Sequence, residues 1–207
     1  MGFKTLLLSP DAKHLHGATL AQAHMSEILP ELSKPTAEPI VFLLDLSKAV
    51  SVTASYLRAT AHWALLCGQA EVQNTGSPAS LEPWAIRPLP LFPLVMKGNA
   101  EVMADVDDFF RTRSLPILVA SKSTATGIKE ARLFGQLDPV LAHTLQALMD
   151  IGEATAKQLS DQSKETITVN GWSNRLADLY LLRLVTRRRD GKFWHYSPIA
   201  KSITLWA

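Results

Sequence analysis

Short apolar runs along the chain alternate with longer segments whose apolar residues recur at helical spacing. The runs are bounded by proline, glycine or serine, and their length suits buried strands. They cover residues 3–8, 40–46, 91–96 and 115–120. The run at 40–46 is apolar at nearly every position, which is typical of a strand that is covered on both faces of its sheet.

The segments between these runs predict helices. One spans 18–32, with Pro30 in its last turn, and another starts at Thr53 or Ser55 as the cap and ends near Cys67, because Gly68 follows. Two more are expected from Asn99 through Arg113 and over 124–136, while 70–90, rich in Gly, Ser and Pro, predicts a loop. This alternation favours an α/β sandwich with a mostly parallel or mixed sheet, ending near Leu137.

A different pattern occupies the last seventy residues. Asp138-Pro139 suits a helix start, and Leu141, Leu145 and Leu148 follow at apolar spacing until Gly152. A second helix is expected over 154–161. Trp172, Leu176, Leu179 and Leu182 then form one stripe of a third helix, and two short runs flank the turn dipeptide Asp190-Gly191. The predicted order is helix, helix, helix, hairpin.

The positive charge of the chain is concentrated beside that turn. Residues 183–192 hold five basic residues against one acid, whereas residues 1–137 balance twelve basic against twelve acidic residues. A local cluster beside a neutral remainder indicates one phosphate-facing edge. In an extended strand Arg187 and Arg189 share one face and Arg188 takes the other. Phe193 and Tyr196 also fall on opposite faces, so we expect one of them to pack on the helices.

The order of elements and the basic turn resemble a winged helix-turn-helix domain, here over residues 138–207. The resemblance implies that the third helix enters the major groove of duplex DNA and that the hairpin contacts phosphate or the minor groove. The helix positions that would touch base edges or backbone are Thr168, Asn170, Ser173 and Asn174, with Arg175 reaching phosphate or turning back to Asp178 or Asp138. The hairpin residues that would contact the backbone are Arg187, Arg188, Arg189 and Lys192.

A second resemblance lies in the front part of the chain. The run Phe42-Leu43-Leu44-Asp45-Leu46-Ser47, followed after a gap by Thr53-Ala54-Ser55-Tyr56-Leu57, is similar to the strand, turn and helix start of STAS domains. The resemblance covers roughly 38–135 and implies a STAS-like α/β domain over 1–137 that serves regulation, dimerisation or partner binding. In that family a Ser or Thr at the helix start is phosphorylated. Ser55 is the corresponding regulatory candidate, although its simplest role is a helix cap.

Other residue groups give no enzyme signature. His14 and His16 supply two metal ligands without a closed set, and Cys67 and His62 lack the spacing of a nucleophilic pair. The glycines are not spaced to cradle a nucleotide, so neither a cofactor nor a metal is expected. Asp45 is expected to bind backbone amides of the following turn. The single cysteine and the absence of a long apolar run favour a cytoplasmic protein.

Two functions follow as expectations. The first is a sequence-specific DNA-binding protein of the bacterial transcription-regulator kind, acting as a homodimer on a palindromic site, with the front domain supplying the dimer surface or a partner or ligand site. The second is a protein-binding adaptor, for instance a subunit of a larger nucleoprotein or phage-defence assembly. A stable co-purifying protein, with DNA binding absent or independent of the hairpin arginines, would favour the adaptor.

Overall fold

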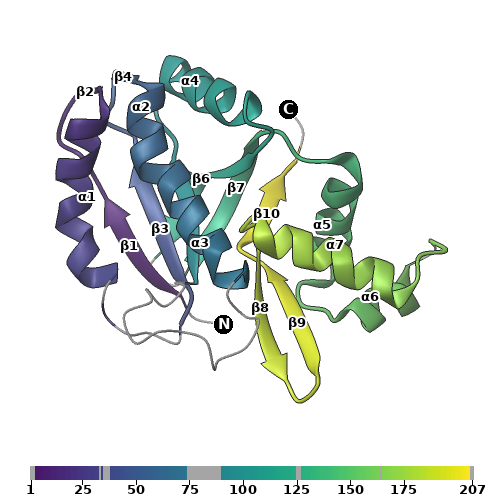
Figure 1. Ribbon diagram of the computed structural model, residues 1–207. Coiled ribbons are helices and arrows are strands. Elements are labelled where there is room, and N and C mark those ends of the chain that lie inside the picture. Colours follow the sequence, from purple (N-terminus) through teal and green to yellow (C-terminus); the bar gives the residue numbers. More distant parts are fainter. Residues whose placement is uncertain are drawn as a thin grey trace.

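A computed structural model describes residues 3–32, 34, 38–73, 90–124, 127–163 and 165–205, except for the side chains of 70–73 and 122–124. Most of the loop predicted over 70–90 lies outside these residues. Within them the chain forms an α/β fold around one six-stranded mixed sheet (Figure 1). The coarse fold class expected from the sequence is therefore confirmed.

The sheet has the order β1-β3-β5-β6-β7-β10. Its strands are β1 (Lys4–Leu8), β3 (Ile40–Asp45), β5 (Leu91–Met96), β6 (Pro116–Thr124), β7 (Gly127–Gly135) and β10 (Ala200–Thr204). The first four are parallel to one another, β7 runs antiparallel to β6, and β10 is parallel to β7. Two short strands, β2 (His14–Leu15) and β4 (Ser51–Val52), pair beyond the ends of β1 and β3.

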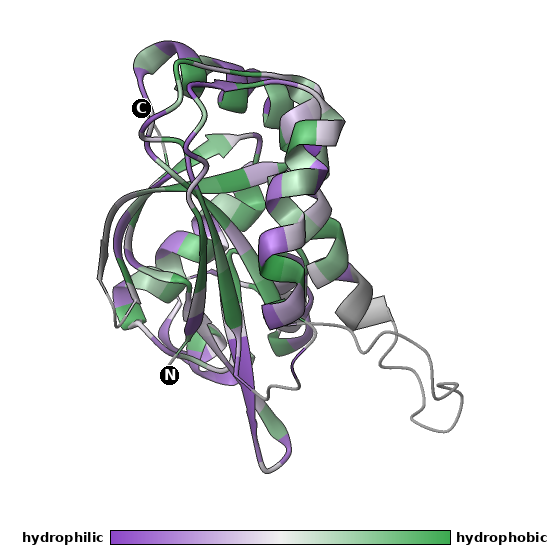
Figure 2. Ribbon diagram, turned by 90° about the vertical axis from the view of Figure 1, so that its left-hand side faces the viewer, coloured by the Kyte–Doolittle hydropathy of each residue, from purple (hydrophilic) through white to green (hydrophobic). Residues whose placement is uncertain are grey.

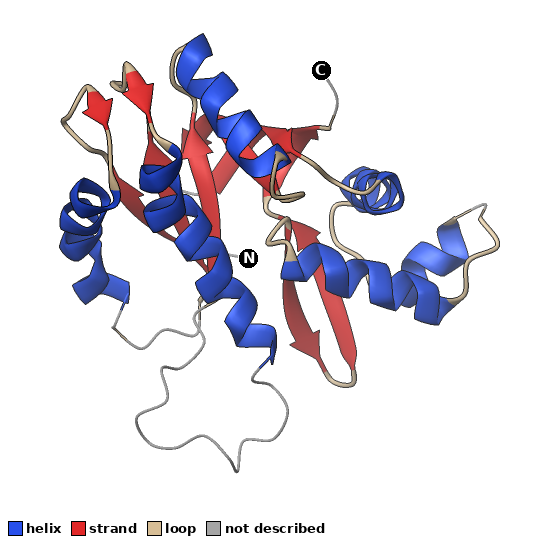
Figure 3. Ribbon diagram, turned by 45° about the horizontal axis from the view of Figure 1, so that its top comes forward, coloured by secondary structure: helices blue, strands red, loops and turns tan. Residues whose placement is uncertain are grey.

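One face of the sheet is covered by the helices that connect its parallel strands. These are α1 (Ala18–Leu32), the continuous run of α2 (Ala54–Leu57), the π-helical turn η1 (Arg58–His62) and α3 (Trp63–Gln73), and α4 (Ala100–Arg111). Alternate strand residues such as Phe42 and Leu44 point into this layer with Tyr56, Leu65 and Phe110. Right-handed crossovers between adjacent parallel strands place all these helices on the same side (Figures 1 and 3).

The other face is covered by the back part of the chain, which forms α5 (Pro139–Ile151), α6 (Ala156–Gln162), α7 (Val169–Leu181), and the hairpin of β8 (Val185–Asp190) and β9 (Phe193–Pro198). Val41, Phe92 and Leu118 of the sheet share one apolar cluster with Trp172 and Leu179 of α7. In Figure 2 the strands between the two layers are coloured hydrophobic. The three helices and the hairpin follow in the predicted order along the chain, but a winged helix-turn-helix motif is not evident in their arrangement.

The boundary predicted near Leu137 falls inside this shared cluster. Leu137 is itself buried there, and β10, which comes from beyond the boundary, pairs with β7 in the main sheet. The two parts of the chain therefore share a core as well as a sheet.

The helix predicted over 124–136 is wrong, since residues Gly127–Gly135 form strand β7. The Lys-Glu-Ala-Arg-Leu sequence favours a helix locally. Pairing with β6 on one side and β10 on the other satisfies its backbone groups instead. Gly135 ends the strand at positive φ, and a Cβ there would lie 2.1 Å from the carbonyl oxygen of Leu115. Tertiary pairing thus overrides local propensity.

The predicted helix end at Gly68 is also wrong, because α3 continues to Gln73. A Cβ at Gly68 would lie 2.4 Å from the carbonyl oxygen of Leu91 and 2.7 Å from Nε of Arg183. The glycine therefore permits a close approach of α3 to β5 and to the buried Arg183, rather than ending the helix.

Two of the predicted helix caps, Asn99 and Asp138, are confirmed, and the cap predicted at Ser55 is wrong. Asn99 accepts a hydrogen bond from the amide of Val102 at 2.9 Å, and Asp138 accepts one from Val140 at 2.7 Å. Ser55 is not a cap: it is the second residue of α2, with Thr53 at the N-cap position. The Thr53 side chain caps no helix amide but accepts from the amide of Gly17 at 3.1 Å.

Candidate nucleic-acid interface

Helix α7 presents a polar face to solvent. Thr168 occupies its N-cap position, where the side-chain oxygen accepts a hydrogen bond from the amide of Gly171 at 3.2 Å. The buried side of the helix carries Trp172, Leu176, Leu179 and Tyr180, and the exposed positions include Thr168, Asn170, Ser173 and Asn174. The amides and hydroxyls predicted to face a partner are therefore on the surface, and Trp172 is a core residue as expected.

Arg175 is placed differently from its neighbours. Its guanidinium lies 3.7 Å from a carboxylate oxygen of Glu165, and 5.8 Å from the ring of Trp172. Glu165 also lies 2.8 Å from Nδ1 of His143 on α5. The prediction that Arg175 turns back to Asp178 or Asp138 is wrong, because Glu165 in the segment before α7 is its partner.

The hairpin beside α7 closes on a two-residue turn formed by Gly191 and Lys192. Asp190 pairs with Phe193 across the turn, and Gly191 has a φ of 56°, a conformation that glycine adopts without strain. The dipeptide Asp190-Gly191 thus marks the turn one residue early. The hairpin projects from the body of the molecule, next to α7 (Figures 1 and 3).

Arg187 lies between two aromatic rings on the face of the hairpin that meets α7. Its guanidinium carbon is 4.1 Å from the ring centroid of Tyr180 and 4.4 Å from that of Trp194. Cation–π contacts of this kind contribute about 0.5–2 kcal/mol each, depending on solvent exposure. We call Tyr180, Arg187 and Trp194 the aromatic stack. It joins the hairpin to α7, so Arg187 has a positioning role.

Arg188 points to the opposite face, as strand alternation predicts, and there it meets a carboxylate. Its Nη2 donates to Glu153 Oε1 at 2.6 Å and its Nε to Oε2 at 3.4 Å, while Ser197 Oγ donates to the same carboxylate at 3.1 Å. The hydrogen bond from Arg188 keeps the pKa of the Glu153 carboxyl below its usual value. The arginine ties the hairpin to the turn between α5 and α6.

Arg189 and Lys192 lie at the free end of the hairpin, and both are exposed. Arg189 Nε donates to the carbonyl oxygen of Gly191 at 3.2 Å, and Lys192 Nζ is 5.3 Å from the ring centroid of Phe193. Neither cation is among the ion pairs found in the described part of the chain. Tyr196 is buried and Phe193 exposed, so the division predicted between these two rings is confirmed.

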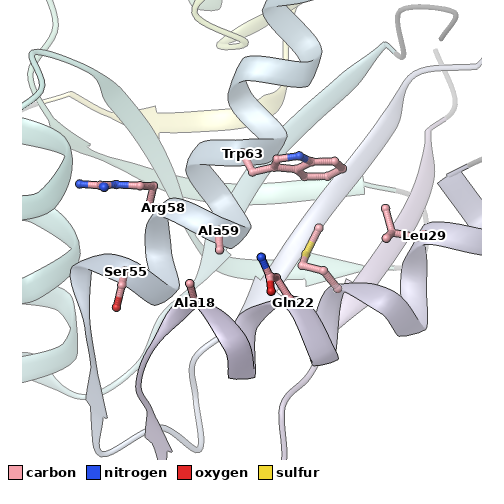
Figure 4. Close-up of a pocket in the computed structure, with 8 residues that line it drawn as sticks. Ala18, Gln22, Leu29, Ser55, Arg58, Ala59 and Trp63 are labelled. Atoms are coloured by element: carbon pink, nitrogen blue, oxygen red, sulfur yellow. The ribbon is translucent and has the colours of Figure 1, made fainter.

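Ser55 borders a separate feature, a groove of about 490 Å³ between α1 and the α2–η1–α3 run (Figure 4). Leu29 and Trp63 contribute apolar surface, and Gln22 and Ser55 contribute polar groups. In Figure 4 the side chains of Arg58 and Trp63 extend from their helix in opposite directions. Ser55 Oγ lies 3.1 Å from Thr53 Oγ1 and is exposed. The π-helical turn at this groove is a feature that occurs frequently at functional sites.

Three of the other residues considered, His14, His16 and Asp45, have hydrogen-bond partners within the fold. His14 Nδ1 and His16 Nε2 lie 2.9 and 2.7 Å from Ser51 Oγ. Asp45 accepts from the amide of Ser47 at 2.9 Å, which is the turn contact predicted for it. Within the described residues, no cluster of three or more His, Cys, Asp or Glu is arranged to hold a metal ion.

Comparison of the chain with models of protein families, with curated proteins and with solved structures finds no match. The structure itself defines an α/β protein with a six-stranded mixed sheet, a solvent-facing polar helix and an adjoining basic hairpin. In the described part of the chain, none of the helices combines the length and apolar composition that a bilayer span needs.

Proposed function

We propose that the protein binds double-stranded DNA through α7 and the β8–β9 hairpin, as a transcription regulator in which α7 acts as the recognition helix and the hairpin as a basic wing. The observation that carries the proposal is the exposed row of Thr168, Asn170, Ser173 and Asn174 on a helix beside a projecting cationic hairpin. An α-helix fits the major groove, where Asn can form two hydrogen bonds with adenine.

We infer different roles for the four hairpin cations from their contacts within the protein. Arg189 and Lys192 are the phosphate-contacting pair, because their charged groups lie at the free end and outside the described ion pairs. Arg187 and Arg188 orient the hairpin through the aromatic stack and through Glu153. Asn170 and Asn174 supply sequence preference, and a second copy bound to a palindromic site supplies the remaining contact area.

The test begins with selection of duplexes from a random pool by the purified protein, followed by titration of an enriched duplex at several salt concentrations. The double substitution Arg189→Ala/Lys192→Ala is expected to weaken binding to all duplexes and to lower the slope of log K against log salt by about 1 per lost contact. Asn174→Ala is expected to change which sequences are enriched more than it changes affinity.

A matched control removes the same charge elsewhere. Lys97 and Lys129 are exposed and distant in sequence from the hairpin, and Lys97→Ala/Lys129→Ala should leave the salt slope unchanged. An equal loss of duplex affinity in both double variants would show that binding depends only on the net charge of the protein, and not on the hairpin cations. Absence of salt-sensitive binding to any duplex would refute the proposed function.

A second candidate function, a protein-binding adaptor, is favoured by the groove of Figure 4. Its lining includes Leu29 and Trp63 from two neighbouring helices, and Leu29 is exposed. Exposed apolar surface of this type suits a protein contact. A partner that co-purifies with the wild-type protein and is lost with Trp63→Ala, while the Arg189→Ala/Lys192→Ala variant retains it, would support the adaptor. Under that reading Ser55 at the rim is a regulatory position.

A further inference from the structure

Two large aromatic residues are exposed at the free end of the hairpin. Phe193 retains 48% and Trp194 40% of its accessible surface. A single exposed apolar side chain is ordinary, but here two adjacent rings occupy opposite faces of a projecting two-stranded element. Burial of such a side chain is favourable, and the folded chain gains only part of that stabilisation at these two positions. The exposed pair therefore points to contact with a partner.

The rings of Phe193 and Trp194 have different contacts within the protein. Trp194 belongs to the aromatic stack, with Arg187 at 4.4 Å from its ring centroid and Arg189 at 5.9 Å. Phe193 lies on the other face and directly follows the turn, where Lys192 is 5.3 Å from its ring centroid. Phe193 is thus the exposed ring nearest the turn. The adjacent Lys192 favours a polyanionic partner, and the carboxylate of Asp190, which pairs with Phe193, lies 3.7 Å from Arg188 Nη1.

We propose that Phe193 is an apolar wedge that enters between two stacked base pairs of the bound duplex from the minor groove and kinks the DNA. The proposal rests on the DNA-binding function above. Proteins that insert a phenylalanine in this way unstack one base step and bend the duplex by tens of degrees. Arg189 and Lys192 contact the phosphates on either side. The aromatic stack holds the hairpin against α7, which fixes the position of the ring relative to the major-groove helix.

The experiment measures bending of a selected duplex that carries a donor and an acceptor dye at its two ends. Wild-type protein is expected to raise the energy-transfer efficiency. Phe193→Ala is expected to bind with an unchanged salt slope, because no cation is removed, and to leave the duplex nearly straight. Phe193→Leu should retain most of the bend, since leucine also serves as a wedge. Leu66→Ala, at another exposed apolar residue, is the control and should bend DNA like the wild type.

A second readout depends only on the wild-type protein. An aminopurine base placed in turn at each step of the selected duplex should become brighter at one step, because unstacking relieves its quenching. Bound DNA that is straight, that shows no brighter step, or that is bent equally by Phe193→Ala refutes the wedge and leaves the DNA-binding function standing. Absence of any duplex binding refutes the function itself, so the two failures are distinguishable.

Discussion

At the scale of single residues, Glu153 accounts for one attachment of the hairpin to the rest of the fold. Its carboxylate receives hydrogen bonds from Arg188 and Ser197, and the guanidinium of Arg188 lowers its pKa from the usual value near 4.5. Stability that arises from a lowered carboxyl pKa is present above the unfolded-state pKa and is lost as pH falls through the folded-state pKa. The attachment is therefore intact at neutral pH and released in acid.

We predict that Glu153→Gln lowers the free energy of unfolding at neutral pH. The difference from wild type should shrink as the pH falls below 4.5 and be lost below the lowered pKa of Glu153 in the folded protein. The effect is small, because exposed ion pairs contribute little. Denaturant unfolding of both proteins over a pH series measures it. Asp105→Asn, at an exposed residue of α4, is the control for removal of a carboxylate away from the hairpin. A constant difference at every pH would mean that the carboxylate charge is not what attaches the hairpin.

At the scale of elements, the sequence was most informative where local patterns and tertiary packing agree. The stripe of Trp172, Leu176 and Leu179 specified α7 because the same residues face the core in the structure. Strand β7 could not be predicted in this way. Its helix-favouring sequence is overridden by β10, which lies about seventy residues later and carries no local sign of that pairing.

The candidate interface shows the same limit. Exposure of Asn170, Ser173 and Asn174 followed from helical spacing, since these positions lie off the apolar stripe. The partners of Arg187 and Arg188 could not be predicted from spacing. Tyr180 and Glu153 lie outside the strand that carries these arginines and contact them only in the folded chain. A run of three arginines therefore predicts a basic hairpin but does not say which cations remain at the surface for a ligand.

Gly68 supports a prediction about how α3 meets the sheet. Alanine in a helix interior is usually better than glycine by about 0.5–1 kcal/mol. Here the added Cβ meets the backbone of Leu91, which cannot move aside like a side-chain end, and the Nε of Arg183. We expect Gly68→Ala to destabilise the protein by about 1–3 kcal/mol, the usual range for overpacking. Thermal or denaturant unfolding measures the change.

The same substitution in another helix is the control. At Gly171 of α7 the nearest atom to an added Cβ is a side-chain methyl of Ile167, at 2.8 Å, which a rotation can displace. Gly171→Ala should therefore cost less than Gly68→Ala. If the order were reversed, or if both variants were as stable as the wild type, the close approach of α3 to β5 would be wrong.

At the scale of the whole molecule, the polar helix and the hairpin depend on the sheet of the front part. Phe92 packs against Tyr180 with ring centroids 6.1 Å apart, and Tyr180 in turn contacts Arg187 of the hairpin. A continuous set of contacts thus runs from β5 through α7 to the candidate interface. This packing gives the front part a structural role: it positions α7 and the hairpin, which form the candidate interface.

We therefore predict that residues 138–207 do not fold cooperatively alone. Separation at the boundary expected from the sequence would expose Trp172, Leu179 and the pairing edge of β10. Their partners Phe92, Leu118 and β7 remain in the other fragment. The full chain should unfold in one denaturant transition, whereas the fragment should show a broad change and bind a hydrophobic dye. A sharp transition in the fragment would show that its own three helices and hairpin suffice, and that contact with the sheet only adds to an independent domain.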